Sequence, residues 1–363
     1  MPTVSILLTV FTRTTWLADA IASALNQTFD DLELIVTDDA NQPQTRDICA
    51  RFRHDPRLRY RANPSPLGVP LNLAAALAEA RGQFIAILND DDLLHPQMLQ
   101  KLIVPLQQNP DPVLAFANHN VIDPHGTPLP AATRQLMGDR ARDGLPPGLI
   151  PQPLDFAVRG GLMAGMACLV RADALAPSWL ISDVAGACDF WLAIKLAARG
   201  PFYFVPEPLM SWRQHPDSIT ARPSPDKFAA ETYIYSCLAR TPFSPPLAAH
   251  VTNQLANTLF VRGREHLARR WSTAAARRFL RQSLQTQWHF HTFRYWCSTF
   301  LPWPMRQASI KAWRNARSVR DVWRPKITDE DRLIKAKTNI EHSTSNVQRR
   351  TSGSSAVEVA QSK

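Results

Sequence analysis

Residues 85–96 read IAILNDDDLLHP and combine a strand of buried type with a cluster of three carboxylates. The apolar run at 85–88 has the composition of a strand that is covered on both faces. Asp90, Asp91 and Asp92 follow it directly, and neighbouring carboxylates repel one another unless a cation lies among them. Oxygen ligands of this kind suit Mg²⁺ or Mn²⁺. Because such a metal commonly completes its shell with substrate phosphates, the stretch predicts a site for a nucleotide diphosphate.

Apolar segments alternate with segments of helical pattern on both sides of this stretch. Strands are predicted at 4–10, 32–37, 58–60, 84–88, 162–170 and 202–205, and helices at 16–26, 44–52, 69–80 and 188–199. The alternation predicts an α/β fold built from βαβ units around a mainly parallel sheet. The segment 126–153 is rich in Pro, Gly, Arg and Asp and is predicted to be a loop.

Polar residues stand at the carboxyl ends of three predicted strands. One group runs from Thr9 to Arg13, the second is the pair Asp38 and Asp39, and the third is the acidic triplet. Ligands of parallel sheets bind outside the carboxyl ends of the strands. The sequence therefore predicts that one substrate touches all three groups.

The composition is that of a globular protein. The chain has 363 residues with 45% hydrophobic content and a mean hydropathy of -0.21, which leaves room for a full core and a second domain. No apolar run has the length of a membrane-spanning helix. The opening MPTVSILLTVF predicts a first strand rather than a signal peptide. Together with five scattered cysteines, this indicates a reducing, cytoplasmic location.

The positive charge is concentrated toward the C-terminus. Residues 241–325 hold 14 Lys or Arg against two acidic residues, whereas the whole chain has a net charge of +10. Two interpretations of this tryptophan-rich segment stay open: an amphipathic face on an anionic inner membrane leaflet, or a helical domain with its own aromatic core. No motif supports nucleic-acid binding, and none is expected. The predicted organisation is a catalytic domain at 1–222, a basic helical region at 223–325 and a disordered tail at 326–363.

Four ordered blocks resemble the inverting family 2 glycosyltransferases, which have the GT-A fold. They read VSILLTVFTR, ALNQTFDDLELIVTDDA, RGQFIAILNDDDLLHP and SWRQHPDSIT, and they cover about residues 3–220. The resemblance implies a Rossmann-like sheet flanked by helices, followed here by a C-terminal helical extension. It also implies metal-assisted transfer of a sugar, with inversion, from a nucleotide-sugar donor, expected to be a UDP-sugar. The acceptor would be a glycan or a lipid-linked molecule of surface polysaccharide or glycolipid biosynthesis.

The resemblance assigns the contacts of the nucleoside residue by residue. Thr9, Phe11 and Arg13 occupy the turn that flanks the base, where the family usually has Pro-Thr-Tyr-Asn-Arg. Asp39 matches the carboxylate that accepts a hydrogen bond from the base. Asp90 matches the carboxylate near the ribose. Phe11 can stack on a ring as the usual tyrosine does.

The diphosphate and the metal are assigned in the same way. Asp91 matches the direct metal ligand, and His215 matches the distal histidine that approaches the metal or the diphosphate. Arg213 is expected to contact a phosphate. Asp92 is expected to cap the helix that begins near Pro96.

The general base is expected to be Asp189. An inverting transfer needs a carboxylate that takes the proton of the acceptor hydroxyl. The family usually supplies it at the start of an E-D-x-D-L-W-L helix, whereas residues 186–192 read GACDFWL and lack the acidic pair. Asp183 is the second candidate. Two rival functions stay open: a glycosyltransferase-like protein that binds nucleotide or glycan without turnover, and a nucleotidyltransferase. The absence of glycine from residues 10–16 argues against the nucleotidyltransferase.

Overall fold

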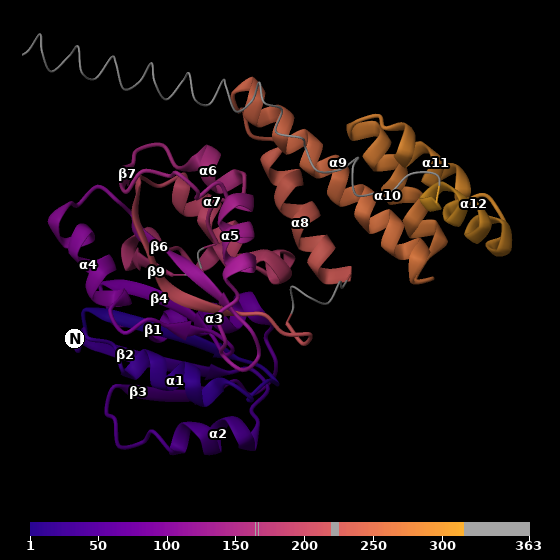
Figure 1. Ribbon diagram of the computed structural model, residues 1–363. Helices are drawn as coiled ribbons and strands as arrows, with labels where there is room; N and C mark the ends of the chain where they lie inside the picture. Colours follow the sequence, from indigo (N-terminus) through magenta and orange to yellow (C-terminus); the bar gives the residue numbers. More distant parts are fainter. Residues whose placement is uncertain (164, 166, 219–224, 316–363) are drawn as a thin grey trace, which may run out of the picture. The chain divides into compact units, whose positions relative to one another are not determined.

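The computed structural model describes residues 1–163, 165, 167–218 and 225–315, with the side chains of 225–227 and 311–315 left out. One compact unit spans Met1–Thr299 (Figure 1). A second unit begins at Phe300, and its described part holds the helix α12 (Trp303–Asn315). The predicted boundary near 223 and the predicted tail at 326–363 both fall outside the described residues.

Within the described residues, a nine-stranded sheet forms the centre of the first unit. The strands are β1 (Val4–Val10), β2 (Leu32–Asp38), β3 (Leu58–Ala62), β4 (Phe84–Asn89), β5 (Leu93–Leu94), β6 (Leu114–Ile122), β7 (Gly148–Ile150), β8 (Cys168–Arg171) and β9 (Phe202–Arg213). Their order is β3-β2-β1-β4-β8-β6-β9-β5, with β7 beside β9. β1 runs parallel to β2 and β4, whereas β8 runs antiparallel to β4 and β6. The predicted α/β fold with a mainly parallel sheet is confirmed.

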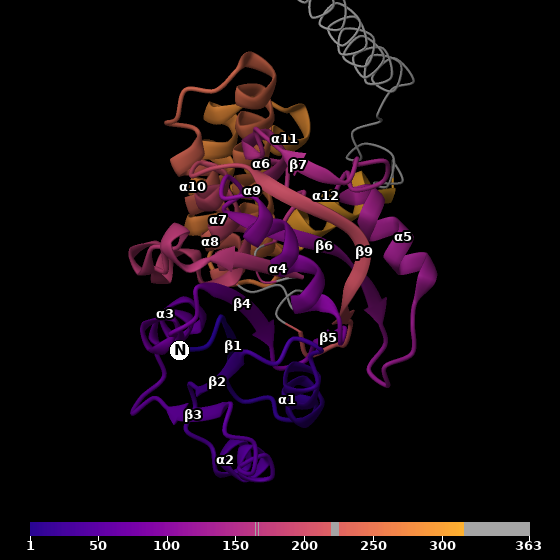
Figure 2. The same ribbon diagram turned by 90° about the vertical axis from the view of Figure 1, so that its left-hand side faces the viewer.

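Helices cover both faces of this sheet. They are α1 (Leu17–Leu25), α2 (Pro43–Ala50), α3 (Val69–Glu79), α4 (Met98–Gln108), α5 (Pro130–Asp139), α6 (Leu154–Val158) and α7 (Cys188–Ala197), with 3₁₀ turns at Ala172–Ala174, Pro177–Trp179 and Ser182–Ala187. Successive residues of β1 point to opposite faces of the sheet. Leu7 packs in the hydrophobic cluster that includes α3 and α7, whereas Ile6 and Leu8 pack in the cluster that includes α1 and α4. Figure 2 shows α3 and α1 on opposite sides of β1 and β2.

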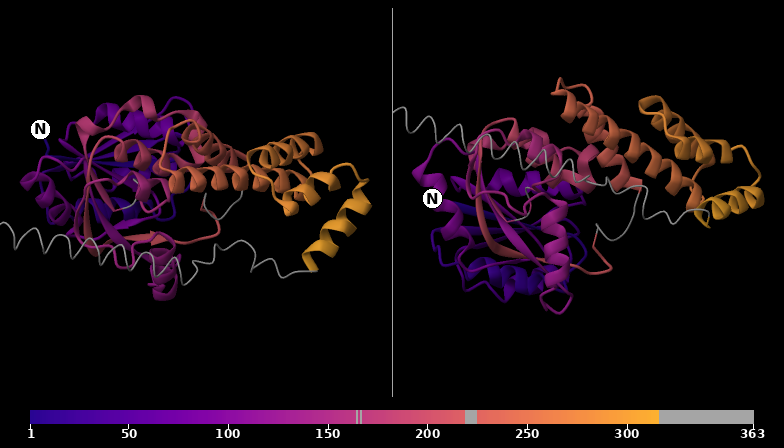
Figure 3. Two further views of the ribbon diagram at one scale, coloured as in Figure 1. Left: turned by 90° about the horizontal axis from the view of Figure 1, so that it is seen from above. Right: turned by 45° about the horizontal axis from the view of Figure 1, so that its top comes forward.

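Four more helices complete the first unit: α8 (Pro225–Leu238), α9 (Pro245–Ala268), α10 (Thr273–Thr286) and α11 (Phe290–Ser298). Ile234 of α8 and Val251 of α9 are buried in the same cluster as Leu192 of α7. α10 lies alongside α9 (Figures 1 and 3), where Gly263 faces Leu280. The first helices of the basic region therefore share a core with the sheet. No helix in the described ranges is long and apolar enough to cross a membrane.

Three local predictions are wrong. The segment 126–153 is not only loop, because Pro130 starts α5 at a position where its missing N–H costs nothing, and Gly148–Ile150 pairs with β9. The strand predicted at 162–170 is confined to Cys168–Arg171. Asp92 does not cap α4: in the described chain the N-cap residue is Gln97, which forms no side-chain cap bond.

Candidate active site

The three polar groups at the strand ends meet at one edge of the sheet. Thr9 of β1 is in register with Thr37 of β2 on one side and with Asn89 of β4 on the other. The residues that follow these positions, among them Asp39 and Asp90, therefore emerge together, as the parallel pairing requires.

Asp39 fixes the segment that leads into α3. One of its carboxylate oxygens accepts from Asn63 Nδ2 and from the Leu67 backbone N–H, both at 2.8 Å, and the other accepts from the Gly68 N–H at 2.8 Å. Gly68 has a φ of 84°, a conformation that favours glycine, so its N–H can turn toward the carboxylate. The buried Asp39 is thus held rigidly, with an oxygen that still has a lone pair for a ligand N–H.

Asp38, its neighbour, is held by an equal number of hydrogen bonds. Its carboxylate accepts from the backbone N–H groups of Ala40 and Gln42 at 3.0 and 2.9 Å and from the Tyr60 hydroxyl at 3.0 Å. Phe11 stands at the same edge with 51% of its surface exposed, which leaves its ring available for stacking.

The acidic triplet is buried and concentrates negative charge. Arg13 contacts Asp90 and lies 2.7 Å from Asp91 Oδ2, while His215 Nε2 lies 3.0 Å from the same oxygen. Burial raises the pKa of Asp90 to about 7, although Arg13 opposes the rise. Burial and the charge of Asp91 also raise the pKa of Asp92. A cation bound beside the triplet would lower the pKa values of both Asp90 and Asp92.

Asp92 and Arg213 join the acidic loop to β9. Asp92 accepts from the Arg213 backbone N–H at 3.0 Å and from Asn89 Nδ2 at 2.9 Å. The Arg213 guanidinium donates to the carbonyl oxygens of Asp91 and Pro124 at 2.9 and 3.0 Å and is 2% exposed. In this arrangement Arg213 positions the backbone of Asp91, and its Nε and Nη1 donors are used within the protein.

His215 is held by an aromatic contact that the sequence did not reveal. Its ring centroid lies 4.4 Å from that of Trp16, and the Trp16 indole N–H donates to the Pro124 carbonyl at 2.9 Å. The buried His215 Nδ1 has no hydrogen-bond partner in the part of the chain that the structure describes. Trp16 reads in the sequence only as the apolar start of a helix, and no local pattern links it to a histidine so far along the chain.

Asp91 and His215 are the pair best placed to hold a divalent metal. Among the described residues, no group of three or more His, Cys, Asp or Glu side chains is arranged to hold a metal. Two protein ligands nevertheless suffice where waters and substrate phosphates complete the shell. The excess of carboxylate charge around Asp91 fits such a cation.

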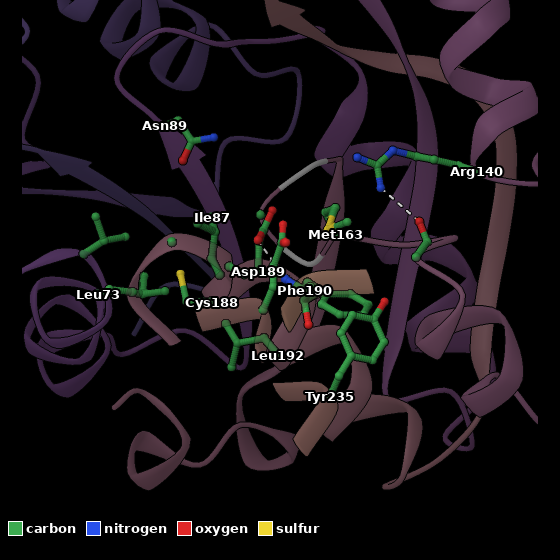
Figure 4. Close-up of a pocket in the computed structure, with 18 of the residues that line it drawn as sticks. Leu73, Ile87, Asn89, Arg140, Met163, Cys188, Asp189, Phe190, Leu192 and Tyr235 are labelled. Atoms are coloured by element: carbon green, nitrogen blue, oxygen red, sulfur yellow. Dashed lines mark hydrogen bonds between the residues drawn. The ribbon is translucent and has the colours of Figure 1, made fainter. Parts of the chain in front are cut away.

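Asp189 lies in a cavity of about 440 Å³ next to these strand ends (Figure 4). It stands in the first turn of α7, and its Oδ1 accepts from the Phe190 backbone N–H at 2.8 Å. Thr9 and Asn89 line the same cavity, whereas Asp183 is exposed and is not among the described lining residues. The geometry thus favours Asp189 over Asp183 as the acid that faces a substrate.

The C-terminal helices form part of the wall of this cavity. Their lining residues are Glu231 and Tyr235 from α8 and Gln254, Asn257 and Thr258 from α9. Arg140, which follows α5, lines it as well. The sequence did not indicate these residues, because the family resemblance ends near residue 220 and the segment around Arg140 resembled a loop.

A family match and several relatives show which known proteins this chain resembles. Residues 5–151 match the family described as glycosyl transferase family 2. Protein CgeD of Bacillus subtilis is 28% identical over 128 residues, which are 33% of this chain and 30% of CgeD. The GalNAc(5)-diNAcBac-PP-undecaprenol beta-1,3-glucosyltransferase of Campylobacter jejuni is 35% identical over 105 residues, which are 28% of this chain and 34% of that enzyme. The chain thus spans about a third of the length of these two relatives.

Solved structures extend the likeness to the fold as a whole. S. aureus TarS 1-349, solved alone and in complex with UDP-GlcNAc, superposes with a TM-score of 0.56 at 15% and 14% identity. The match covers 91% of this chain and 95% of that one, so it includes helices beyond the family segment. Residues 5–151 are thus similar to glycosyl transferase family 2, and the fold of the described chain is of the GT-A type.

Proposed function

We propose that this protein transfers a sugar from a nucleotide diphosphate donor, with inversion, to an acceptor hydroxyl held beside Asp189. The observation that carries the proposal is the shared cavity: Asp189 lines it together with Thr9 and Asn89, which stand at the strand ends where the donor is expected. A carboxylate beside a donor site is what an inverting displacement requires.

The donor would be held by the strand ends. Asp39 would accept from the base and Phe11 would stack on it, while Asp90 would lie at the ribose side. A UDP-sugar is the first donor class to test, because TarS, a protein of the same fold, was solved with UDP-GlcNAc. Asp91 and His215 would hold Mg²⁺ or Mn²⁺, and the bound metal would neutralise charge on the departing diphosphate.

In the reaction, Asp189 would take the proton of the acceptor hydroxyl while that oxygen attacks the anomeric carbon. The bond from this carbon to the diphosphate oxygen breaks as the new glycosidic bond forms on the opposite face, and the nucleoside diphosphate leaves. Arg213 and Asp92 hold the backbone of Asp91 in place throughout. A rigid acidic loop keeps the donor aligned for in-line attack.

We further propose a glycan or lipid-linked acceptor at the cytoplasmic face of a membrane, in surface polysaccharide or glycolipid biosynthesis. The name of the Campylobacter relative describes transfer to an undecaprenol-linked glycan. In this chain Trp288 and Phe290 are 63% and 61% exposed, and the Trp288 ring lies near the rings of Phe290 and Phe293 in α11. Exposed aromatics on a strongly basic segment suit the interface of an anionic membrane.

A donor screen by thermal shift tests the proposal. Nucleotides and nucleotide sugars with Mn²⁺ should raise the melting temperature of the wild type, and Asp91→Asn should lose the part of the shift that depends on Mn²⁺. If no nucleotide stabilises the wild type, the donor site is refuted.

A binding protein without turnover is the second candidate, favoured by the loss of the acidic pair before Phe190. It predicts stabilisation by a nucleotide sugar without any hydrolysis or transfer. Release of nucleoside diphosphate from the stabilising donor separates the two functions.

A further inference from the structure

Arg140 is a largely buried cation without an ion pair in the described part of the chain. Its guanidinium donates to the Gly160 carbonyl at 2.9 Å, and its Nε has no hydrogen-bond partner there. Burial lowers the pKa of Arg140, while the charges of Asp189 and Asp139 oppose the shift without approaching to ion-pair distance. A buried guanidinium with unused donors is costly unless a ligand completes its contacts.

The neighbouring Arg142 shows what a purely structural arginine looks like in this fold. Its guanidinium donates to the carbonyls of Gly161 and Ala117 at 2.9 and 3.0 Å and lies 5.3 Å from the Phe116 ring. Arg142 thereby anchors the segment after α5. Arg140, in contrast, lines the cavity of Asp189, and its guanidinium points toward the middle of that cavity (Figure 4).

The position of Arg140 indicates the acceptor rather than the donor. The residues expected to meet the diphosphate, Asp91 and His215, do not line the cavity in the described part of the chain. The cavity is instead lined by Asp189 of α7, Glu231 of α8, and Gln254 and Asn257 of α9. These two amides are three residues apart on α9 and so lie on one helix face. Amide side chains both donate and accept, which suits sugar hydroxyls.

We infer that Arg140 binds an acidic group of the acceptor, a phosphate or a carboxylate, and that α9 binds the hydroxyls of the same acceptor. The inference rests on the proposed function, since it takes Asp189 as the base. An acceptor anchored in this way would present its hydroxyl to Asp189 at a fixed distance from the anionic group. Neutral acceptors of the same size would bind more weakly, because they leave the buried guanidinium unpaired.

The test measures binding of small anions to the full chain with the donor site filled by UDP and Mg²⁺. Orthophosphate and glucuronate are the probes, and glucose is the neutral control. The variants are Arg140→Gln, the charge-retaining Arg140→Lys, and Arg134→Gln as a matched control, because Arg134 is exposed on α5. Thermal shift gives the apparent affinity for each probe, and titration of UDP is measured separately.

One or both anions should stabilise the wild type and Arg134→Gln, and glucose should not. Arg140→Gln should weaken anion binding by about tenfold or more, as expected for a lost charge-assisted contact, while Arg140→Lys retains most of it. Comparison of the two anions identifies the acidic group. Absence of any anion effect on the wild type, or an equal effect on Arg140→Gln, overturns the inference.

A tenfold loss of UDP affinity in Arg140→Gln would also overturn it, since the cation would then serve the donor. Failure of UDP and every other nucleotide to bind the wild type is a different outcome and refutes the proposed function instead. In that case the anion titration is run without nucleotide, and the same comparison of Arg140→Gln with Arg134→Gln decides the inference.

Discussion

Asp189→Asn tests the assignment of the base directly. Asparagine keeps the size of the side chain and an oxygen that can accept from the Phe190 N–H, but it cannot take a proton. Loss of a general base lowers a rate by about 10²- to 10⁴-fold, or about 3–5 kcal/mol of transition-state stabilisation. The nearest alternative acid by sequence, Asp183, is exposed and does not line the described cavity, so it offers no rescue.

The assay is release of nucleoside diphosphate from the donor that the thermal-shift screen identifies. Asp189→Asn should reduce kcat by the factor above and leave the affinity for the donor unchanged. Loss of the negative charge in the first turn of α7 should cost only about 0.3–1 kcal/mol of stability, measured by urea unfolding. Asp183→Asn serves as the control and should behave as the wild type. An Asp189→Asn rate within threefold of the wild type would refute the role of base.

Three further predictions concern packing, charge and the membrane. Gly82→Ala should destabilise the protein by about 1–3 kcal/mol in urea unfolding, because its Cβ would lie 2.5 Å from the Ser5 backbone nitrogen. In the control Gly138→Ala the new Cβ meets the exposed Asp143 carboxylate at 3.2 Å, which can turn away, so this variant should be tolerated. Equal stability of the two variants would contradict the prediction. Burial alone would raise the pKa of Glu33, but hydrogen bonds from Ser5, Arg81 and Arg59 lower it below the ordinary 4.5. The difference in unfolding free energy between the wild type and Glu33→Gln should therefore be full above pH 4.5 and shrink as the pH falls further. A difference that does not change with pH would count against this prediction. Replacing Trp288 and Phe290 together by serine should reduce sedimentation with anionic vesicles at low salt, and unchanged sedimentation would reject that aromatic pair as the membrane contact.

The sheet and its functional edge could be predicted because both follow from local chemistry. The alternation of apolar strands and amphipathic helices determines βαβ pairing, and parallel pairing brings the residues after Thr9, Thr37 and Asn89 to one edge. The contacts inside that edge could not be predicted in the same way. Arg213 is predicted to bind a phosphate because it is an arginine near the site. In the fold, its guanidinium donates to the backbone carbonyls of Asp91 and Pro124.

The cavity beside Asp189 could not be predicted from the sequence, for a different reason. Its walls come from segments far apart in the chain: Arg140 after α5, Asp189 on α7, and Gln254 and Asn257 on α9. Arg140, Gln254 and Asn257 each have an ordinary surface interpretation in the sequence, and only tertiary packing brings them into one cavity with Asp189. Residues that only packing brings together carry no shared periodicity, so a single sequence has no pattern that would indicate them.

The position of α9 also changes how the C-terminal region has to be tested. Deletion of residues from 241 onward would be the simple way to ask whether the basic segment binds membranes. That deletion would, however, remove Gln254 and Asn257 from the cavity wall and Val251 from the core cluster that α7 shares. Activity would then be lost whether or not a membrane is involved. Only surface substitutions such as those at Trp288 and Phe290, far along the chain from the cavity residues of α9, can separate membrane attachment from acceptor binding.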